Sequence, residues 1–245
     1  MTFICASRRC QPVEGIALRP LPSLMWVDLS MPLTGDEWDD LSAEEHRKAV
    51  RFRCPHDQRR YLAAHSALRR ALAAQGAGEA SSLRFKAGAW GKPALCDSSG
   101  LRFNLSHSGD IGLIGSSFSH EVGVDVEFIR AVPDAASLVS EHFSVDERRE
   151  FERLPPKTRE RAFLIGWTRK EACLKAVGVG LSVDPSSIEA GLTCEPCSLT
   201  IALDAEWSVV EVHSTLGSCG VVGAVAQVHS RRVERLPIAS IGWVQ

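Results

Sequence analysis

Two stretches of this 245-residue chain have the periodicity of long helices, and each is followed by two glycines. Residues 57–74 repeat apolar side chains at roughly helical spacing, and residues 158–177 form the longest such stretch. Glycine just after the last periodic residue is a common stop signal, because it adopts the left-handed conformation that closes a helix. The sequence therefore predicts one long helix in each half of the chain.

Short strands are predicted around both helices. Gly109-Asp110 makes a turn between the alternating segment 101–108 and the apolar segment 111–118, which indicates an antiparallel hairpin. Since each half combines helical segments with antiparallel-type strands, we expect an α+β fold with one lobe at 1–118, including an extension at 1–22, and a second lobe at 119–245. The other predicted strands are 24–29, 83–85, 123–127, 199–203, 207–213 and 220–228.

Two shorter helices begin at capping-box sequences, in which Ser42 is followed three residues later by Glu45, and Ser144 by Glu147. The first should run to Phe52 and stop before Pro55, because the residue before a proline disfavours the helical conformation. The second should end at the two prolines that follow residue 154.

The composition is that of an ordinary globular protein, with 44% hydrophobic residues and a formal net charge of −2. So small a net charge argues against nucleic acid as a bulk electrostatic partner. No apolar run approaches the length of a membrane span, and the N-terminus does not resemble a signal peptide. The cysteines follow no framework spacing, which is typical of reduced thiols. We therefore expect a cytoplasmic protein without nucleic-acid or membrane partners.

The segment Gly123-Val124-Asp125-Val126-Glu127 alternates apolar and acidic residues. Alternate residues of a strand point to the same face, so the valines should be buried while Asp125 and Glu127 share the other face. Two acids about 6–7 Å apart repel each other unless a cation lies between them. Mg²⁺ is the natural candidate, since it takes oxygen ligands and shares them with substrate phosphates. The alternative is a pair of solvated acids on an edge strand.

Glu171 and Lys175 are four residues apart on the long helix 158–177, so their side chains are neighbours on its surface. One interpretation is an exposed ion pair that contributes a few tenths of a kcal/mol. The other makes Glu171 a third carboxylate ligand and Lys175 a phosphate-binding ammonium. Spacing alone favours the first.

Asn104, Ser106 and Ser108 fall on one face of the predicted strand 101–108. His107 points the other way, and a lone histidine here is more often structural than catalytic. Neighbours on a strand diverge, which disfavours a hydrolase dyad of Ser106 and His107. Lys92, in the stiff loop that precedes proline 93, is a weak signal by itself. The chain has neither a Walker A loop nor a dinucleotide-binding G-x-G-x-x-G motif.

Taken together, four blocks of sequence resemble the 4′-phosphopantetheinyl transferases, and within them the larger, surfactin-synthetase-activating (Sfp-like) type. The blocks follow one another in the order typical of the family, and a looser match reaches back over residues 47–60. They are W-G-K-P at 90–93, F-N-L-S-H-S at 103–108, G-V-D-V-E at 123–127 and W-T-R-K-E-A-C-L-K-A-V-G-V-G-L at 167–181.

The resemblance implies two similar α+β lobes in a pseudo-twofold arrangement with the active site between them. It further implies an enzyme that transfers the phosphopantetheine arm of coenzyme A to a serine of an apo acyl or peptidyl carrier protein, with release of adenosine 3′,5′-bisphosphate. Both halves of such a site come from one chain, which favours a monomer.

The resemblance also implies roles for particular residues. Asp125, Glu127 and Glu171 would hold Mg²⁺, and Glu171 is the candidate base for the carrier serine. Lys175 and His107 would contact the pyrophosphate, and Lys175 would take part in catalysis. Arg60, Lys92, Arg47 and Arg51 would surround the nucleotide and its 3′-phosphate, and Ser106 is a further coenzyme A contact.

Two other classes of function are compatible with the same residues. A Mg²⁺-dependent phosphohydrolase would use the three acids with a positioned water, and a non-catalytic binding module would keep the lobes alone. For a transferase we expect a carrier-docking surface near the lobe interface, with exposed apolar residues around Phe118 or Phe143.

Overall fold

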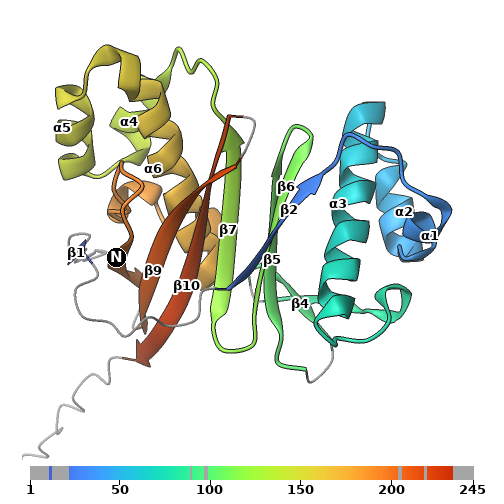
Figure 1. Cartoon of the computed structure of the whole chain (residues 1–245). Coiled ribbons are helices and arrows are strands. Elements are labelled where there is room, and N and C mark those ends of the chain that lie inside the picture. Colours follow the sequence, from blue (N-terminus) through green and yellow to red (C-terminus); the bar gives the residue numbers. More distant parts are fainter. Residues whose placement is uncertain are drawn as a thin grey trace, which may run out of the picture.

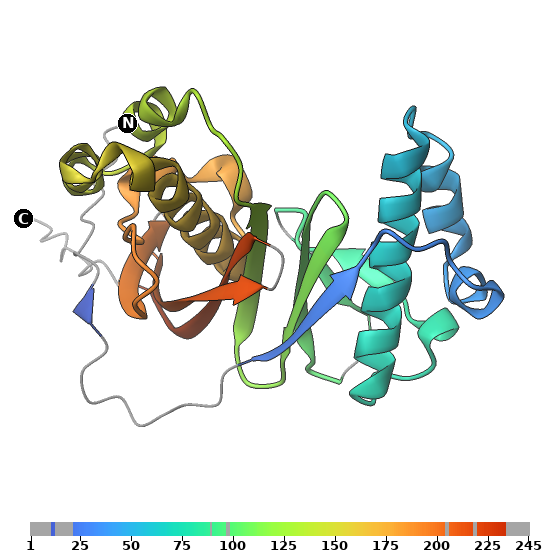
Figure 2. The same cartoon turned by 45° about the horizontal axis from the view of Figure 1, so that its top comes forward.

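The computed structural model describes residues 11–12, 22–88, 90–96, 99–203, 206–217 and 220–233. It shows two α+β lobes, which confirms the predicted fold class. The edge strands of the two lobes meet in the middle, and the long helices lie on opposite sides of this junction (Figure 1, and Figure 2 in a second view).

The first lobe contains a three-stranded antiparallel sheet in the order β2-β6-β5 and a small pair, β3-β4. Helix α3 covers the three-stranded sheet, and its Leu68 and Leu72 pack against Phe103 and Ile114. The elements are β2 (Ser23–Asp28), α1 (Gly35–Asp39), α2 (Ala43–Ala49), α3 (Pro55–Ala74), the 3₁₀ turn η1 (Ala80–Ser82), β3 (Phe85–Ala87), β4 (Pro93–Leu95), β5 (Arg102–Ser108) and β6 (Ile111–Ser117).

The second lobe contains a five-stranded sheet in the order β1-β8-β9-β10-β7, in which each neighbouring pair is antiparallel. Helix α6 packs on β7, β9 and β10. The elements are β7 (Glu121–Phe128), α4 (Ala135–His142), α5 (Val145–Arg153), α6 (Pro156–Val177), the 3₁₀ turns η2 (Gly180–Ser182) and η3 (Pro185–Ser187), β8 (Cys197–Leu203), β9 (Glu206–Gly217) and β10 (Val221–Val233), while β1 (Gln11–Pro12) pairs with β8.

The predicted long helices are confirmed as α3 and α6, and each begins at a proline slightly earlier than predicted. Proline suits the first helical position, because its missing N–H has no partner there in any case. Gly178 closes α6 in the left-handed conformation, with a φ of 85°. Both predicted capping boxes are present, at Ser42 and Ser144. Helices α1 and α4 were not predicted, and α2 ends at Ala49, earlier than expected.

Three other expectations are corrected or limited. Phe143 is fully buried, so it cannot belong to an exposed docking surface, whereas Phe118 is exposed. Cys197 is disulfide-bonded, so the prediction of reduced thiols is wrong for this residue. Most of the predicted extension 1–22 lies outside the described residues. Among the described helices, none has the length and apolarity needed to cross a membrane.

Strands β5 and β7 lie side by side at the junction although they belong to different sheets. Side chains join them: the buried Asn104 accepts a hydrogen bond from the backbone N–H of Val124, at 2.9 Å. Leu113 of β6 packs with the valines of β7 in one shared core. The chain changes sheets in the turn between β6 and β7, and we propose that the lobes divide there, at the boundary 118/119.

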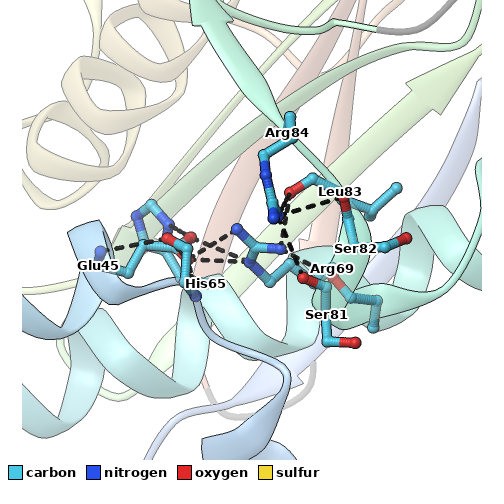
Figure 3. A network of polar contacts seen from close by, with 9 residues as sticks. Glu45, His65, Arg69, Ser81, Ser82, Leu83 and Arg84 are labelled. Atoms are coloured by element: carbon cyan, nitrogen blue, oxygen red, sulfur yellow. Dashed lines mark hydrogen bonds and ion pairs between the residues drawn. The ribbon is translucent and has the colours of Figure 1, made fainter.

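A buried ion pair fixes α2 to α3 in the first lobe. Glu45 lies 2.8 Å from the guanidinium of Arg69, and both side chains are almost fully buried. His65 contacts the same carboxylate at 3.0 Å, and Arg69 also donates to the carbonyl oxygens of Ala80 and Leu83 (Figure 3). One network therefore holds α2, α3 and η1 together.

The Glu45→Gln variant should be less stable than the wild type by about 3–5 kcal/mol at pH 7, because it leaves Arg69 buried without its counter-charge. His65, Arg69 and Ser42 hold the pKa of Glu45 far below its usual 4.5, against the opposing effect of burial. The stabilisation of the fold by ionised Glu45 is therefore complete above pH 4.5 and is lost as the pH falls further. Urea unfolding at several pH values should show the two proteins converging in acid; a constant difference down to pH 3 would contradict this.

A second buried ion pair fixes α5 to α6. Lys170 and Glu147 are 2.6 Å apart and each is 1% exposed. Lys170 also donates to the carbonyl oxygens of Pro185 and Ile188, while Glu147 accepts from the backbone N–H groups of Ala190 and Gly191. Lys170, which lies inside the block that carries the family resemblance, is therefore a structural residue in this chain.

Candidate active site

Asp125 and Glu127 share one face of β7, as predicted. Val124 and Val126 are fully buried on the opposite face. The hydroxyl of Ser106 donates to Asp125 Oδ1 at 2.8 Å, and the hydroxyl of Ser108 donates to Glu127 Oε2 at 2.8 Å. The serines alternate along β5 as the acids alternate along β7, so each carboxylate of β7 is held by a side chain from the other lobe.

Helix α6 brings its polar pair to the same place. Lys175 Nζ lies 2.6 Å from Asp125 Oδ1 and 3.3 Å from the hydroxyl of Ser106. The exposed helix pair favoured by spacing alone is therefore wrong for Lys175, whose ion pair is with Asp125 of β7. Burial raises the pKa of Glu171; Lys175 opposes this shift, while Asp125 and Glu127 add to it. The three carboxylates thus repel one another across a common space.

Gly123 allows α6 to come this close to β7. A Cβ atom at this position would overlap the carbonyl oxygen of Ala172 and the backbone nitrogen of Ala176. Ala172 directly follows Glu171 in the helix, and Ala176 directly follows Lys175. The glycine that begins the G-V-D-V-E block is therefore a packing requirement of the site.

The chemical type of the ligands fits a hard divalent cation, because the carboxylates of Asp125, Glu127 and Glu171 supply the oxygen atoms that Mg²⁺ takes. Burial is the main cause of the raised pKa of Glu171, and a cation would relieve the further contribution that Asp125 and Glu127 make to it. Within the described residues, no three acidic, histidine or cysteine side chains are close enough together to hold an ion. The assignment of Asp125, Glu127 and Glu171 as magnesium ligands therefore stays a prediction.

The Glu171→Gln variant should be more stable than the wild type at pH 7, because the wild type keeps a partly buried carboxylate ionised beside two others. A carboxyl group with a raised folded-state pKa destabilises the fold above that pKa, and the cost disappears as the pH falls below the unfolded value. Thermal unfolding without divalent cations should show that the variant is more stable than the wild type at pH 7 but not at pH 4. A loss of stability at pH 7 would contradict it.

The predicted residues His107, near the end of β5, and Arg60 of α3 interact electrostatically. Arg60 Nε donates to Asp110 at 2.9 Å, and Arg60 Nη1 donates to Asp57 at 3.2 Å. Removal from water lowers the pKa of His107, and Arg60, His65 and Lys175 lower it further. Positive charge from several elements therefore acts on the His107 ring.

Three predicted contacts lie apart from the acids. Arg47 of α2 and Arg51 beyond its end are exposed. Lys92 lies at the other end of β7, where it donates to Glu121 at 2.9 Å and to the carbonyl oxygens of Val122 and Ala176. There it lines a cavity of about 370 Å³ whose wall also includes Trp90, Arg102, Val177 and Val179.

Several residues of the site were not assigned from the sequence. Ser108 and Asn104 were placed on the correct strand face, but their acceptor and donor partners on β7 were not predicted. Asp57 precedes Arg60 by three residues on a helix, a spacing that could have indicated their contact. No local signal pointed to Asp110, because its partners are 50 residues away in the sequence.

Comparison with known proteins identifies the family. The 4′-phosphopantetheinyl transferase superfamily matches residues 121–217, and the family described as 4′-phosphopantetheinyl transferase, N-terminal, matches residues 36–119. The 4′-phosphopantetheinyl transferase HetI of Nostoc sp. is 36% identical over 70% of this chain and 73% of its own length. A putative 4′-phosphopantetheinyl transferase of Synechocystis sp. is 36% identical over 66% of this chain and 67% of its own length. The 4′-phosphopantetheinyl transferase ffp of Bacillus subtilis is 30% identical over 68% of this chain and 75% of its own length.

The chain therefore belongs to the 4′-phosphopantetheinyl transferase superfamily, and it is an enzyme of the transferase class. The relatives include psf-1 of Bacillus pumilus, a 4′-phosphopantetheinyl transferase that is 33% identical over 62% of this chain and 64% of its own length.

Proposed function

We propose that the protein transfers the 4′-phosphopantetheine arm of coenzyme A to a serine of an apo acyl or peptidyl carrier protein. The reaction is Mg²⁺-dependent and releases adenosine 3′,5′-bisphosphate. The observation that carries the proposal is the convergence of Asp125 and Glu127 of β7, Glu171 and Lys175 of α6, and Ser106 of β5 at the lobe junction. The names of the relatives support the same reaction.

The bond changes define what the residues do. The carrier serine oxygen forms a bond to the phosphorus that bears the pantetheine arm, and the bond from this phosphorus to the bridging oxygen of the pyrophosphate breaks. Glu171 accepts the serine proton, because its raised pKa makes it a better base than an ordinary carboxylate. Lys175, already at the centre of the site, contacts the pyrophosphate with its ammonium group.

Mg²⁺ held by Asp125, Glu127 and Glu171 would neutralise the charge that develops on the leaving phosphate. Ser106 and Ser108 keep the two strand carboxylates in place for this role. Arg60 contacts the nucleotide part of coenzyme A and His107 its pyrophosphate, with Arg47, Arg51 and Lys92 as further candidate contacts of the nucleotide. Since both lobes come from one chain, we propose a monomer. The cytoplasmic location and the lack of nucleic-acid or membrane partners stay predictions from the sequence.

Incubation with coenzyme A in the presence and absence of an apo carrier protein separates this proposal from phosphohydrolysis. We expect adenosine 3′,5′-bisphosphate to be released only when both the carrier and Mg²⁺ are present. A carrier whose serine is replaced by alanine is the matched control. Consumption of coenzyme A without a carrier would support the phosphohydrolase instead.

A further inference from the structure

In the turn between β5 and β6, one carboxylate oxygen of Asp110 binds two arginines. Asp110 Oδ1 accepts from Arg60 Nε and from Arg59 Nη2, each at 2.9 Å. Both arginines belong to the second turn of α3, whereas Asp110 directly follows Gly109, whose φ of 53° makes the tight turn. The contact therefore joins the start of the long helix to the end of the strand that carries Ser106 and Ser108.

This turn is itself fixed on two sides. The backbone oxygen of Asp110 accepts from Leu29 N at 2.7 Å, and Arg59 Nε returns a hydrogen bond to Leu29 O at 3.3 Å. On the other side, the ring of Phe128, the residue after Glu127, lies where a side chain at Gly109 would be. Asp110 therefore has a defined position relative to both α3 and the acidic strand.

The space next to the turn favours an anion. Arg60, His65 and Lys175 all lower the pKa of His107, so the charges of Arg60 and Lys175 act on the same ring from different elements. Asp57 raises that pKa, but its effect is smaller than those of the cations. A phosphate group beside His107 would be attracted by both cations.

We propose that Asp110 is a positioning residue for nucleotide binding: it holds the guanidinium of Arg60 beside His107, where Arg60 contacts a phosphate of the nucleotide. This inference rests on the proposed function, and it adds a residue that touches no substrate. A free arginine side chain loses rotamer freedom when a ligand fixes it, and Asp110 fixes it before the ligand arrives.

Asp57 is the weaker partner of Arg60. It lies three residues away on the same helix, its contact with Arg60 is 3.2 Å long against 2.9 Å for Asp110, and its side chain is 51% exposed against 40%. A pair at this spacing on a helix surface restrains a long side chain only weakly. Asp110 comes from another element, and it contacts the Nε edge of the guanidinium.

Isothermal titration with adenosine 3′,5′-bisphosphate, without carrier or Mg²⁺, tests the proposal. Asp110→Asn should weaken binding about 10-fold, which corresponds to about 1.4 kcal/mol. Asp110→Glu should restore part of the affinity, because it keeps the charge. The control Asp146→Asn removes an exposed contact to Arg149 in the other lobe, and its affinity should equal that of the wild type.

A double-mutant cycle with Arg60→Met distinguishes positioning from a general loss of structure. If Asp110 acts through Arg60, then Asp110→Asn should cause no further loss of affinity in the Arg60→Met background. Unchanged or tighter binding by Asp110→Asn, or fully additive losses, would overturn the inference while leaving the proposed function intact. A wild-type protein that does not bind the nucleotide would overturn both.

Discussion

Replacing Asp125 by asparagine should lower kcat/KM for carrier modification by about 10³-fold, which corresponds to about 4 kcal/mol of transition-state stabilisation. The amide has nearly the same shape as the carboxylate, but it carries no charge for a cation or for Lys175, which lies 2.6 Å from Asp125 in the wild type. It can still accept the hydrogen bond from Ser106. The loss should therefore concern the reaction far more than the fold.

Steady-state kinetics and urea unfolding of the same preparation measure the two effects. The control Asp146→Asn changes an acid of α5, which lies outside the proposed site, and should keep wild-type kinetics. A wild-type rate for Asp125→Asn would show that the acid pair of β7 is not part of the catalytic site. A variant that is unfolded would point instead to a structural role for Asp125.

Replacing Gly123 by alanine should destabilise the protein by about 3 kcal/mol and lower the transfer rate by about 10²-fold. The new methyl group would overlap the backbone of α6 at Ala172 and Ala176, so the helix has to move away from β7. Such a movement displaces Glu171 and Lys175 from Asp125, and a shift of about 1 Å in a catalytic group can cost two orders of magnitude.

Urea unfolding and carrier labelling again give the two measurements. Gly35→Ala is the matched control: no atom lies within 4 Å of its added Cβ, and it begins helix α1. This control should be neutral or slightly stabilising. If Gly123→Ala matched it in both assays, the close packing of α6 on β7 would not be what positions the site.

Local patterns in the sequence were sufficient for the elements and for the faces of the strands. Helical periodicity and flanking glycines predicted α3 and α6, and strand alternation placed Asp125 and Glu127 together on one face. These features depend on neighbours in the sequence, which is why they could be predicted. The short helices α1 and α4 were missed.

Contacts between distant segments could not be predicted in the same way. Spacing favoured a solvated Glu171–Lys175 pair, but packing on Gly123 directs Lys175 to Asp125 instead. Lys170, one residue before Glu171, is buried with Glu147 of another helix. Which of two neighbouring charged residues faces a core and which faces a site depends on tertiary packing, and periodicity does not contain that information.

Mass spectrometry of apo carrier proteins after incubation with this protein, coenzyme A and Mg²⁺ is the most direct test of the proposed function. We predict that a carrier gains one phosphopantetheine arm on its serine, and that omitting Mg²⁺ or using the Asp125→Asn variant prevents this gain. If no acyl or peptidyl carrier is modified by the folded wild-type protein, while a relative such as ffp of Bacillus subtilis modifies the same carriers, the proposed function is contradicted.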